Sequence, residues 1–282
     1  MPNECVVCGG KDAKPFYPGL LKCVGCGHVF ADVCLTEDAI SKLYGRAYFF
    51  GDEYIDYIGD KKILQKNFAL RFHVLKTFLS PDQHKHLLEV GCAYGFFLDI
   101  ARDQFETVQG IDINEDAITY ARQHLGIAAE CGDLLKHDLG EKSFDLVCMW
   151  DTIEHTQWPN LYLEKLAKNM KKGSLIAITT GDIESLTARI RKEKWRLIHP
   201  PTHIHYFSMK TLETLLNRNG FEVIYNRYCG FYRSLDFTAY RILVLSKLSP
   251  GLYTYLSKWG LAQASFYLNL YDIMYVIAKK KI

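Results

Sequence analysis

The sequence of 282 residues has no hydrophobic run that approaches the roughly 18 residues needed to cross a bilayer. Its first residues, MPNECVVCGG, lack the basic and apolar regions of a secretory signal peptide. The net charge is only +2, so charge alone gives no reason to expect nucleic acid or an anionic membrane as a partner. We therefore expect a globular, cytoplasmic protein.

The sequence also lacks two glycines that a dinucleotide-binding turn needs. The pattern G-x-G-x-x-G, starting at Gly91, has Ala93 at its second position and Phe96 at its third. Phe96 is too bulky for the close helix–strand contact that the third glycine permits. NAD and FAD are therefore disfavoured.

Around this turn, the sequence is typical of the first half of a nucleotide-binding α/β sheet. An apolar run at 86–90 leads into a turn of small residues, and apolar residues at helical spacing follow. A second apolar run ends at Asp112, whose carboxylate can accept two hydrogen bonds from a ribose diol. Gly91 and Gly95 permit a sharp turn, and we expect them to leave room for a ligand.

Strands and helices then alternate along the chain. Further strands are expected at 127–131, 143–150, 174–180, 221–228 and 272–278, with helices that begin after Asn114 and Ser208. This alternation predicts an α/β fold with a doubly wound sheet, whose ligand site lies at the carboxyl ends of the strands. Asp112, Asp133 and Asp151 fall at such ends. Asp133 could accept a hydrogen bond from an adenine amino group. The alternative is that it is only a turn residue.

Four of the nine cysteines form two pairs with the spacing of a zinc ribbon. The two Cys-x2-Cys pairs are separated by fourteen residues, and each can place two thiolates on one tetrahedral metal ion. Such a site contributes roughly 10–16 kcal/mol of apparent binding free energy, enough to fold a segment with almost no apolar core. The predicted zinc ligands are Cys5, Cys8, Cys23 and Cys26.

Two groups of polar residues are candidates for catalysis. Glu154 and His155 follow a predicted strand, so a histidine that titrates near neutrality lies beside the ligand site, and Glu154 could orient it or bind a metal ion. His203 and His205 follow Trp195 in a stretch that suits a lid over an acceptor pocket. In an extended stretch they share a face and could bind metal together with the first two. The alternative for all four is helix capping and packing.

The order of these motifs resembles that of the class I S-adenosylmethionine (SAM) methyltransferases, over about residues 80–230 and 272–280. The resemblance implies a seven-stranded Rossmann-like sheet of order 3-2-1-4-5-7-6 with an antiparallel last strand. The runs EVGCAYGFFLDIA, MWDTIEH and HPPTHIHYFS are similar to a bacterial and archaeal subfamily associated with sugar, cell-surface or small-metabolite methylation. The cofactor-binding residues that it implies are Glu89, Gly91, Ala93, Gly95, Asp112, Ile113, Asp133, Leu134 and Asp151.

On this basis we divide the chain into a zinc ribbon at 1–30, a helical, aromatic-rich segment at 31–80 and a SAM-binding domain at 81–282. The aromatic segment is expected to lie over the open edge of the sheet, with its rings as cover and core. One of its tyrosines, or Arg71, could also reach the cofactor.

Two further segments leave alternatives open. The basic run at 189–196 suits a phosphate, as in a nucleotide-sugar or RNA, or else a solvated helix face. A helical insertion is expected at 231–271, with two helices split at Pro250. Its aromatic and basic composition would allow it to bind an anionic membrane or to cover an apolar acceptor. It could equally form a homodimer interface or the wall of a pocket.

We therefore predict SAM-dependent methyl transfer to a small-molecule acceptor: a sugar, a lipid-linked compound or another metabolite, with an oxygen, nitrogen or carbon as the methylated atom. One alternative is an RNA-modifying enzyme that grips RNA with its ribbon. The ribbon carries only Lys11, Lys14 and Lys22 against Glu4 and Asp12, which disfavours nucleic acid. The other alternative is a non-catalytic interaction module with the same fold.

Overall fold

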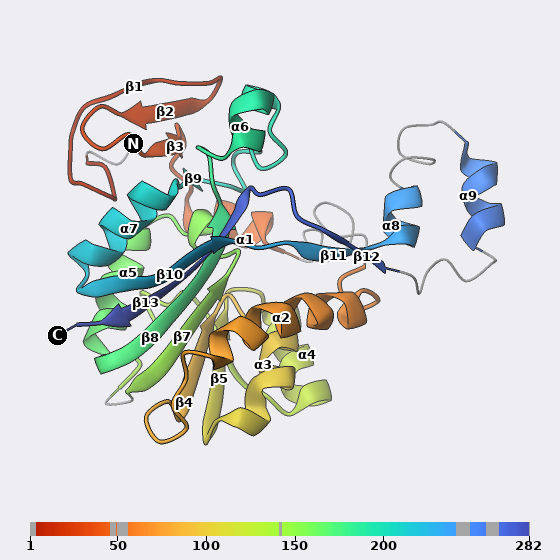
Figure 1. Cartoon of the computed structure of the whole chain (residues 1–282), viewed down its shortest axis with the longest axis horizontal. Coiled ribbons are helices and arrows are strands. Elements are labelled where there is room, and N and C mark those ends of the chain that lie inside the picture. Colours follow the sequence, from red (N-terminus) through yellow and green to blue (C-terminus); the bar gives the residue numbers. More distant parts are fainter. Residues whose placement is uncertain are drawn as a thin grey trace.

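The computed structural model of the chain describes residues 4–45, 49, 56–140, 143–240, 249–257 and 265–281. A seven-stranded sheet forms its centre, in the order β10-β13-β8-β7-β4-β5-β6 (Figure 1). Neighbours from β6 to β8 pair in parallel, whereas β13 is antiparallel to both β8 and β10. This is the predicted order with an antiparallel last strand, so the predicted fold is confirmed. The strands are β4 (His86–Val90), β5 (Thr107–Asp112), β6 (Ala128–Cys131), β7 (Phe144–Trp150), β8 (Met170–Gly181), β10 (Phe221–Tyr228) and β13 (Ile273–Lys280).

Helices cover both faces of this sheet because alternate residues of each strand point to opposite sides. In β7, Leu146 and Cys148 belong to one buried cluster, and Val147 and Met149 belong to the other. The first cluster includes residues of α2 (Lys61–Lys76), α3 (Phe96–Ala101) and α4 (Glu115–Leu125). The second includes residues of α5 (Pro159–Lys168) and α7 (Met209–Arg218).

The position of α2 corrects the prediction for the aromatic segment. Phe72 and Leu75 of α2 are buried against a face of the sheet, so this helix does not cover the open edge. Burial of such side chains stabilises the packing by about 1.5–3 kcal/mol each, which an edge position would not supply. Three aromatics of the predicted segment, Tyr48, Phe50 and Tyr54, lie outside the described residues.

Several short elements connect the strands and helices. Helix α1 (Glu37–Leu43) begins at Thr36, whose hydroxyl accepts from the backbone N–H of Ala39. The others are α6 (Leu186–Arg191) and the 3₁₀ turns η2 (Arg102–Gln104), η3 (Ile153–His155) and η4 (Lys192–Lys194). Arg189, Arg191 and Lys192 are exposed, which agrees with a solvated helix face for most of the basic run.

The amino-terminal cysteine segment is part of a second sheet. Its strands β1 (Ala13–Pro15), β2 (Leu20–Cys23) and β3 (Val29–Ala31) are joined by β9 (His205–Tyr206), which comes from far along the chain. Val7, Cys23 and Phe30 are buried in the same cluster as α5 and α7. The ribbon is therefore packed into the main core and is not a free appendage.

The insertion after β10 is only partly helical, which corrects the prediction. Its described part begins with β11 (Phe231–Ser234) and ends with β12 (Ser265–Leu268), and these pair as an antiparallel ladder. Between them, α8 (Leu235–Tyr240) and α9 (Pro250–Ser257) project from the body of the molecule (Figure 1). Residues 241–248 of the predicted first helix lie outside the described residues. Membrane contact and dimerisation through this segment stay predictions.

Among the described residues, no helix is both long enough and apolar enough to cross a membrane.

Candidate active site

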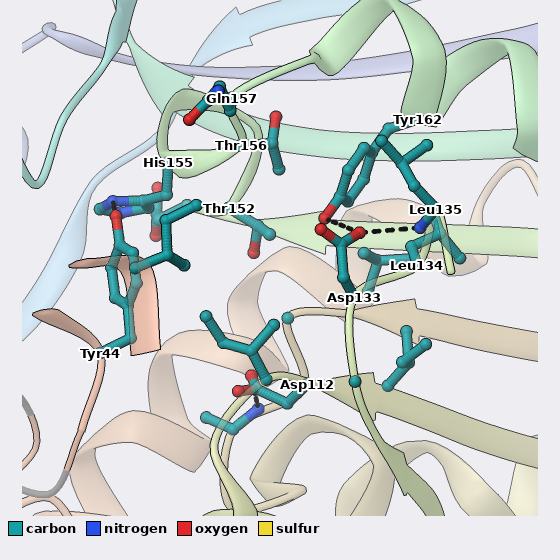
Figure 2. Close-up of a pocket in the computed structure, with 18 of the residues that line it drawn as sticks. Tyr44, Asp112, Asp133, Leu134, Leu135, Thr152, His155, Thr156, Gln157 and Tyr162 are labelled. Carbon is teal, nitrogen blue, oxygen red and sulfur yellow. Dashed lines mark hydrogen bonds between the residues drawn. The ribbon is translucent and has the colours of Figure 1, made fainter. Parts of the chain in front are cut away.

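A cavity opens at the carboxyl ends of β4, β5, β6 and β7 (Figure 2). Acids that are distant in the sequence meet here because parallel strands end at the same edge of the sheet. The aromatic residues Tyr44 and Tyr57, from the segment before α2, also line the cavity. The predicted residues that line it are Gly91, Ala93, Asp112, Ile113, Asp133, Leu134, Asp151 and His155.

Asp112, at the end of β5, is held on both carboxylate oxygens. The backbone N–H of Ala93 donates to Oδ2 at 2.8 Å, and that of Asn114 donates to Oδ1 at 2.9 Å. Burial raises the pKa of the Asp112 carboxyl above its ordinary value, while these N–H groups act in the opposite direction. Each oxygen has a second lone pair, so the carboxylate can accept two further bonds from a diol in the cavity.

The glycine turn between β4 and α3 uses positive φ angles at three positions: Gly91 (φ 76°), Ala93 (φ 44°) and Gly95 (φ 75°). A Cβ on Gly91 would lie 2.5 Å from the side chain of Thr152. The room expected for a ligand at this glycine is therefore occupied by Thr152, which itself lines the cavity. Gly95 is the N-cap of α3 and faces Ala121 of α4.

Asp133 is oriented by a residue that the sequence did not single out. Its Oδ1 accepts from the Tyr162 hydroxyl at 2.7 Å and from the backbone N–H of Leu135 at 2.8 Å. Its Oδ2 makes no hydrogen bond among the described residues, so it is the oxygen available to an adenine amino group. Ile113 is 38% exposed and forms an apolar part of the lining, as a purine ring requires.

Glu89, the acid before the glycine turn, lies beneath the cavity. The residue is 2% exposed, and its Oε2 has no hydrogen-bond partner among the described residues. Burial raises the pKa of its carboxyl well above the ordinary value, and the nearby Asp112 charge adds to this rise. Glu89 does not line the cavity, so the structure gives it no direct contact with a ligand there.

A second cavity lies next to the first and shares part of its lining. The residues common to both are Tyr57, Trp150, Asp151 and His155. The second cavity also has Glu154 and His203 in its wall, together with side chains from α2 and β11. The polar and aromatic side chains that these elements and the loop after α6 contribute are Asn67, Phe68, Arg71, Arg196, Phe231, Tyr232, Arg233 and Ser234.

Asp151 lies at the junction of the two cavities in a strained conformation. Its φ of 50° is uncommon for a residue other than glycine, although aspartate is among the residues that tolerate it best. Arg71 of α2 donates to its Oδ2 at 2.8 Å, and the Arg71 side chain is only 9% exposed. This ion pair fixes the carboxylate between the cavities. Arg71 lines the second cavity and not the first, so its expected contact with the cofactor stays a prediction.

The expectation that His155, in η3, titrates near neutrality is wrong, because burial lowers its pKa to about 4. The side chain is therefore a neutral imidazole over the physiological range. Its Nδ1 lies 2.8 Å from the backbone oxygen of Thr202, which is an acceptor only. Nδ1 therefore carries the proton and Nε2 carries the basic lone pair. The Tyr44 hydroxyl donates to the same oxygen at 2.8 Å and lies 3.1 Å from Nδ1, so all three groups meet at this edge of the ring.

Glu154 and His203 lie beside His155. Burial raises the pKa of the Glu154 carboxyl to about 8, with the Asp151 charge acting in the same direction. Burial also lowers the pKa of His203 well below its ordinary value. One ligand atom from each of the three residues lies within 4.8 Å of the others, so they could hold a metal ion together. The same group can equally bind a polar acceptor.

His205 is placed differently from the prediction. It does not share a face with His203, because its Nδ1 lies 3.1 Å from Nε2 of His28 in a buried contact with the ribbon. It lines neither cavity, which excludes direct contact with an acceptor there. Trp195 is also no part of a lid: it is 2% exposed, and its Nε1–H donates to the buried Asp272.

The four predicted zinc ligands are gathered at one point. Their sulfur atoms all lie within 4.8 Å of one another, with Cys5 and Cys26 at 3.7 Å and Cys8 and Cys23 at 3.5 Å. A tetrahedral zinc with bonds of about 2.3 Å separates its sulfurs by about 3.8 Å. The four thiols therefore fit a structural zinc site without a change of backbone.

Comparison with known proteins decides the family. The sequence profile described as "Methyltransferase domain" matches residues 64–226, more than half of the chain. The chain belongs to this family. Among curated relatives, the ubiquinone biosynthesis O-methyltransferase of Hydrogenovibrio crunogenus is 28% identical over 134 residues, 44% of this chain and 54% of that protein. The chain thus spans about half the length of this relative.

Other similarities extend further along this methyltransferase-family chain. An uncharacterized protein of Methanocaldococcus jannaschii, MJ0638, is 26% identical over 192 residues, 66% of this chain and 78% of that one. The structure of magnesium protoporphyrin IX methyltransferase from Synechocystis PCC 6803 has a TM-score of 0.55 at 12% identity, covering 87% and 100% of the two chains. A SAM-dependent methyltransferase from Mesorhizobium loti has a TM-score of 0.50 at 18% identity, covering 74% and 97%. The two solved structures support the fold alone.

Sequence reasoning missed several residues that build the site. Thr152 and Trp150 stand beside predicted residues but carry no signal of their own in the sequence. Tyr162 lies in the first turn of α5, on its buried face. This position is the only signal in the sequence that could have indicated its contact with Asp133. Tyr44 is one of several tyrosines in its segment, and nothing in the sequence distinguishes it from the others.

Proposed function

We propose that the chain transfers the methyl group of SAM to a small-molecule acceptor bound in the second cavity. The observation that carries this proposal is the lining that the two cavities share: Tyr57, Trp150, Asp151 and His155. A methyl group bound in one cavity can be presented at this junction to an acceptor in the other. Membership of the methyltransferase domain family supports the reaction class.

The residues of the first cavity fit the adenosine part of SAM. Asp112 would accept from the ribose hydroxyls, Asp133 would accept from the adenine amino group, and the side chain of Ile113 would pack on the purine ring. SAM supplies a methyl group on an already activated sulfonium. The chain has to hold an acceptor lone pair in line with that bond, and such positioning is worth roughly 7–11 kcal/mol.

A hydroxyl is the acceptor group that the junction favours. His155 presents a neutral imidazole there, and with its pKa lowered to about 4 it is a weak base. It can take the hydroxyl proton late in the transfer, when methylation of the oxygen has made that proton strongly acidic. The name of the curated O-methyltransferase relatives supports an oxygen as the methylated atom. A sugar, a lipid-linked compound and another hydroxylated metabolite all carry such a group.

The second cavity suits a polar acceptor with an apolar body. Phe231 and Tyr232 contribute aromatic surface. The lining also contributes polar side chains, among them Asn67, Ser234 and Arg196, which support a polar ligand.

The ribbon supports a small-molecule acceptor more than RNA. Val7 and Cys23 are buried, and β3 is covered by β9, so much of the ribbon surface is already used inside the chain. Its few lysines would give RNA only a weak electrostatic footprint.

The test is release of S-adenosylhomocysteine (SAH) from SAM in the presence of separate acceptors. Phenols, catechols, sugars and amines are each compared with a structured RNA of similar total concentration. We expect SAH release with a hydroxyl compound, accompanied by a product one methyl group heavier in the mass spectrum. Release with RNA alone would overturn the proposed acceptor class, and failure to bind SAM would overturn the reaction.

A further inference from the structure

The ribbon and the histidine-rich loop share a sheet. Strand β3 of the ribbon pairs with β9, with Val29 opposite Tyr206 and Phe30 opposite His205. Strand β9 begins at His205, two residues after His203, which lines the second cavity. The last residues of the loop are therefore fixed by the ribbon.

Ile204 connects the ribbon to the turn that carries the candidate base. Its carbonyl oxygen accepts from the backbone N–H of Ala31 at 2.8 Å, and its own N–H donates to the carbonyl oxygen of Glu154 at 2.9 Å. One residue thus joins β3 to η3 through main-chain hydrogen bonds. Because both bonds are short and Ile204 is 4% exposed, water does not easily replace them.

The same loop orients His155. The carbonyl oxygen of Thr202, two residues before Ile204, receives the Nδ1–H of His155 and the hydroxyl of Tyr44, each at 2.8 Å. This contact selects the tautomer whose Nε2 is basic. A displacement of the loop would remove the hydrogen bond that fixes both the orientation of the His155 ring and its tautomer.

A buried pair of histidines, one from the ribbon and one from β9, lies near the cysteines. His28 is fully buried, and its Nε2 lies 3.1 Å from Nδ1 of His205. The carbonyl oxygen of His28 accepts from the N–H of Cys23 at 2.8 Å, across the second cysteine knuckle. The cysteine cluster, β3 and β9 are therefore contiguous.

The strands of the ribbon have three or four residues each, too few to hold their arrangement alone. A metal ion on the four thiolates would supply the missing stability. We infer that the four-cysteine site is a positioning device for catalysis: it holds β3, β3 holds β9, and β9 fixes the Thr202–His155 contact. A role of this device in catalysis rests on the proposed function. The contacts from the cysteine cluster to His155 do not.

Hydrogen exchange followed by mass spectrometry tests this inference on the full chain. The zinc-loaded protein is compared with the same protein after chelation, both with SAH present. We expect chelation to speed exchange at 197–207 and 150–158 by roughly tenfold or more, as local opening allows, while β4 and β5 keep their protection. Loss of protection in the ribbon alone, with 197–207 unchanged, would overturn it.

Two variants keep the test decisive if chelated protein aggregates. Cys8→Ser removes one ligand. Its control is Cys34→Ser, at an exposed cysteine outside the cluster, where the serine hydroxyl can still accept from Gln157 as the Cys34 sulfur does. Ala31→Pro removes the N–H that donates to Ile204 and leaves all four thiols in place. We expect Cys8→Ser and Ala31→Pro to shift the His155 ring signals in the NMR spectrum, and Cys34→Ser to leave them unchanged.

Unshifted His155 signals in Ala31→Pro, in a protein that still binds zinc, would contradict the inference. SAH affinity, measured by calorimetry on the same samples, is expected to fall but not to be lost. Asp112 and Asp133 have no part in this chain of contacts, whereas Thr152 and His155, which line the same cavity, lie in the loosened segment. Loss of SAH binding in the unmodified protein would instead count against the proposed function.

Discussion

At the scale of single residues, the site depends on carboxylates whose orientation is fixed before a ligand arrives. Backbone N–H groups hold both oxygens of Asp112, and Tyr162 with Leu135 holds one oxygen of Asp133. A ligand that meets such groups does not have to order them, and that saves conformational entropy on binding.

Asp112→Asn tests the ribose contact. The amide keeps one acceptor oxygen and loses the charge, so one charge-assisted hydrogen bond to the ribose is lost. Its NH2 group also has to face the backbone N–H of Ala93 or Asn114, which loses its acceptor. We expect the affinity for SAH to fall roughly 10- to 100-fold in calorimetry. Asp116→Asn, an exposed acid in the first turn of α4, is the matched control and should bind normally. Equal affinities for the two variants would disprove the assignment of Asp112.

His155 makes a prediction about pH and stability. A histidine in an unfolded chain has a pKa near 6.5, whereas burial lowers that of folded His155 to about 4. As the pH falls, the unfolded state binds the proton first, so stability is fully present above about pH 6.5 and is lost toward about pH 4. His155→Gln cannot titrate, and it should lose roughly 2 kcal/mol less than the wild type between about pH 7 and about pH 5.

Urea unfolding at the two pH values measures this difference. His73→Gln, at an exposed position of α2, is the control and should keep the pH dependence of the wild type. A His155→Gln protein whose unfolding free energy changes with pH as steeply as that of the wild type would refute the lowered pKa.

At the scale of elements, the site is assembled from strand ends, one long helix and two loops. Helix α2 brings Arg71 to Asp151 at the end of β7, and its apolar side packs on the sheet. This ion pair ties the covering helix to the junction of the two cavities. Its loss should therefore affect both stability and the site.

Asp151→Asn tests this connection. Asparagine tolerates the positive φ well, so the main effect is a buried Arg71 guanidinium that has lost its charged partner. Because Asp151 is partly exposed, we expect a loss of roughly 2–3 kcal/mol in urea unfolding. Adding Arg71→Met should recover part of this loss. A double variant whose loss is the sum of the two single losses would show that the pair is not coupled.

The regular elements could be predicted from the sequence because their signals are local. The strand predicted at 221–228 has the same bounds as β10. Asn114 is the N-cap of α4 and Gly126 is its C-cap, as expected for these residue types. The sheet order came from the resemblance to a family and not from these local signals.

The elements that escaped prediction depend on distant partners. Strand β9 has only two residues, and it exists because β3, far along the chain, pairs with it. That pairing turns His205 toward His28 and away from His203, so alternation alone could not place it. The β11–β12 pair also closes across a long insertion, where helical spacing was the stronger local pattern.

At the scale of the whole molecule, two sheets and two cavities meet at one place. The central sheet supplies the acids of the first cavity, and the ribbon sheet fixes the loop that borders the second. Methyl transfer needs both: a cofactor with a fixed sulfur, and an acceptor that approaches from the opposite side. Their common lining at Asp151 and His155 is therefore the central claim of this account.

A crystal structure of the chain with SAH tests that claim most directly. We predict that the ribose hydroxyls bind Asp112, that the adenine amino group lies at Asp133, and that the sulfur points to the junction lined by Asp151 and His155. SAH bound elsewhere, or bound with its sulfur turned away from the second cavity, would contradict it.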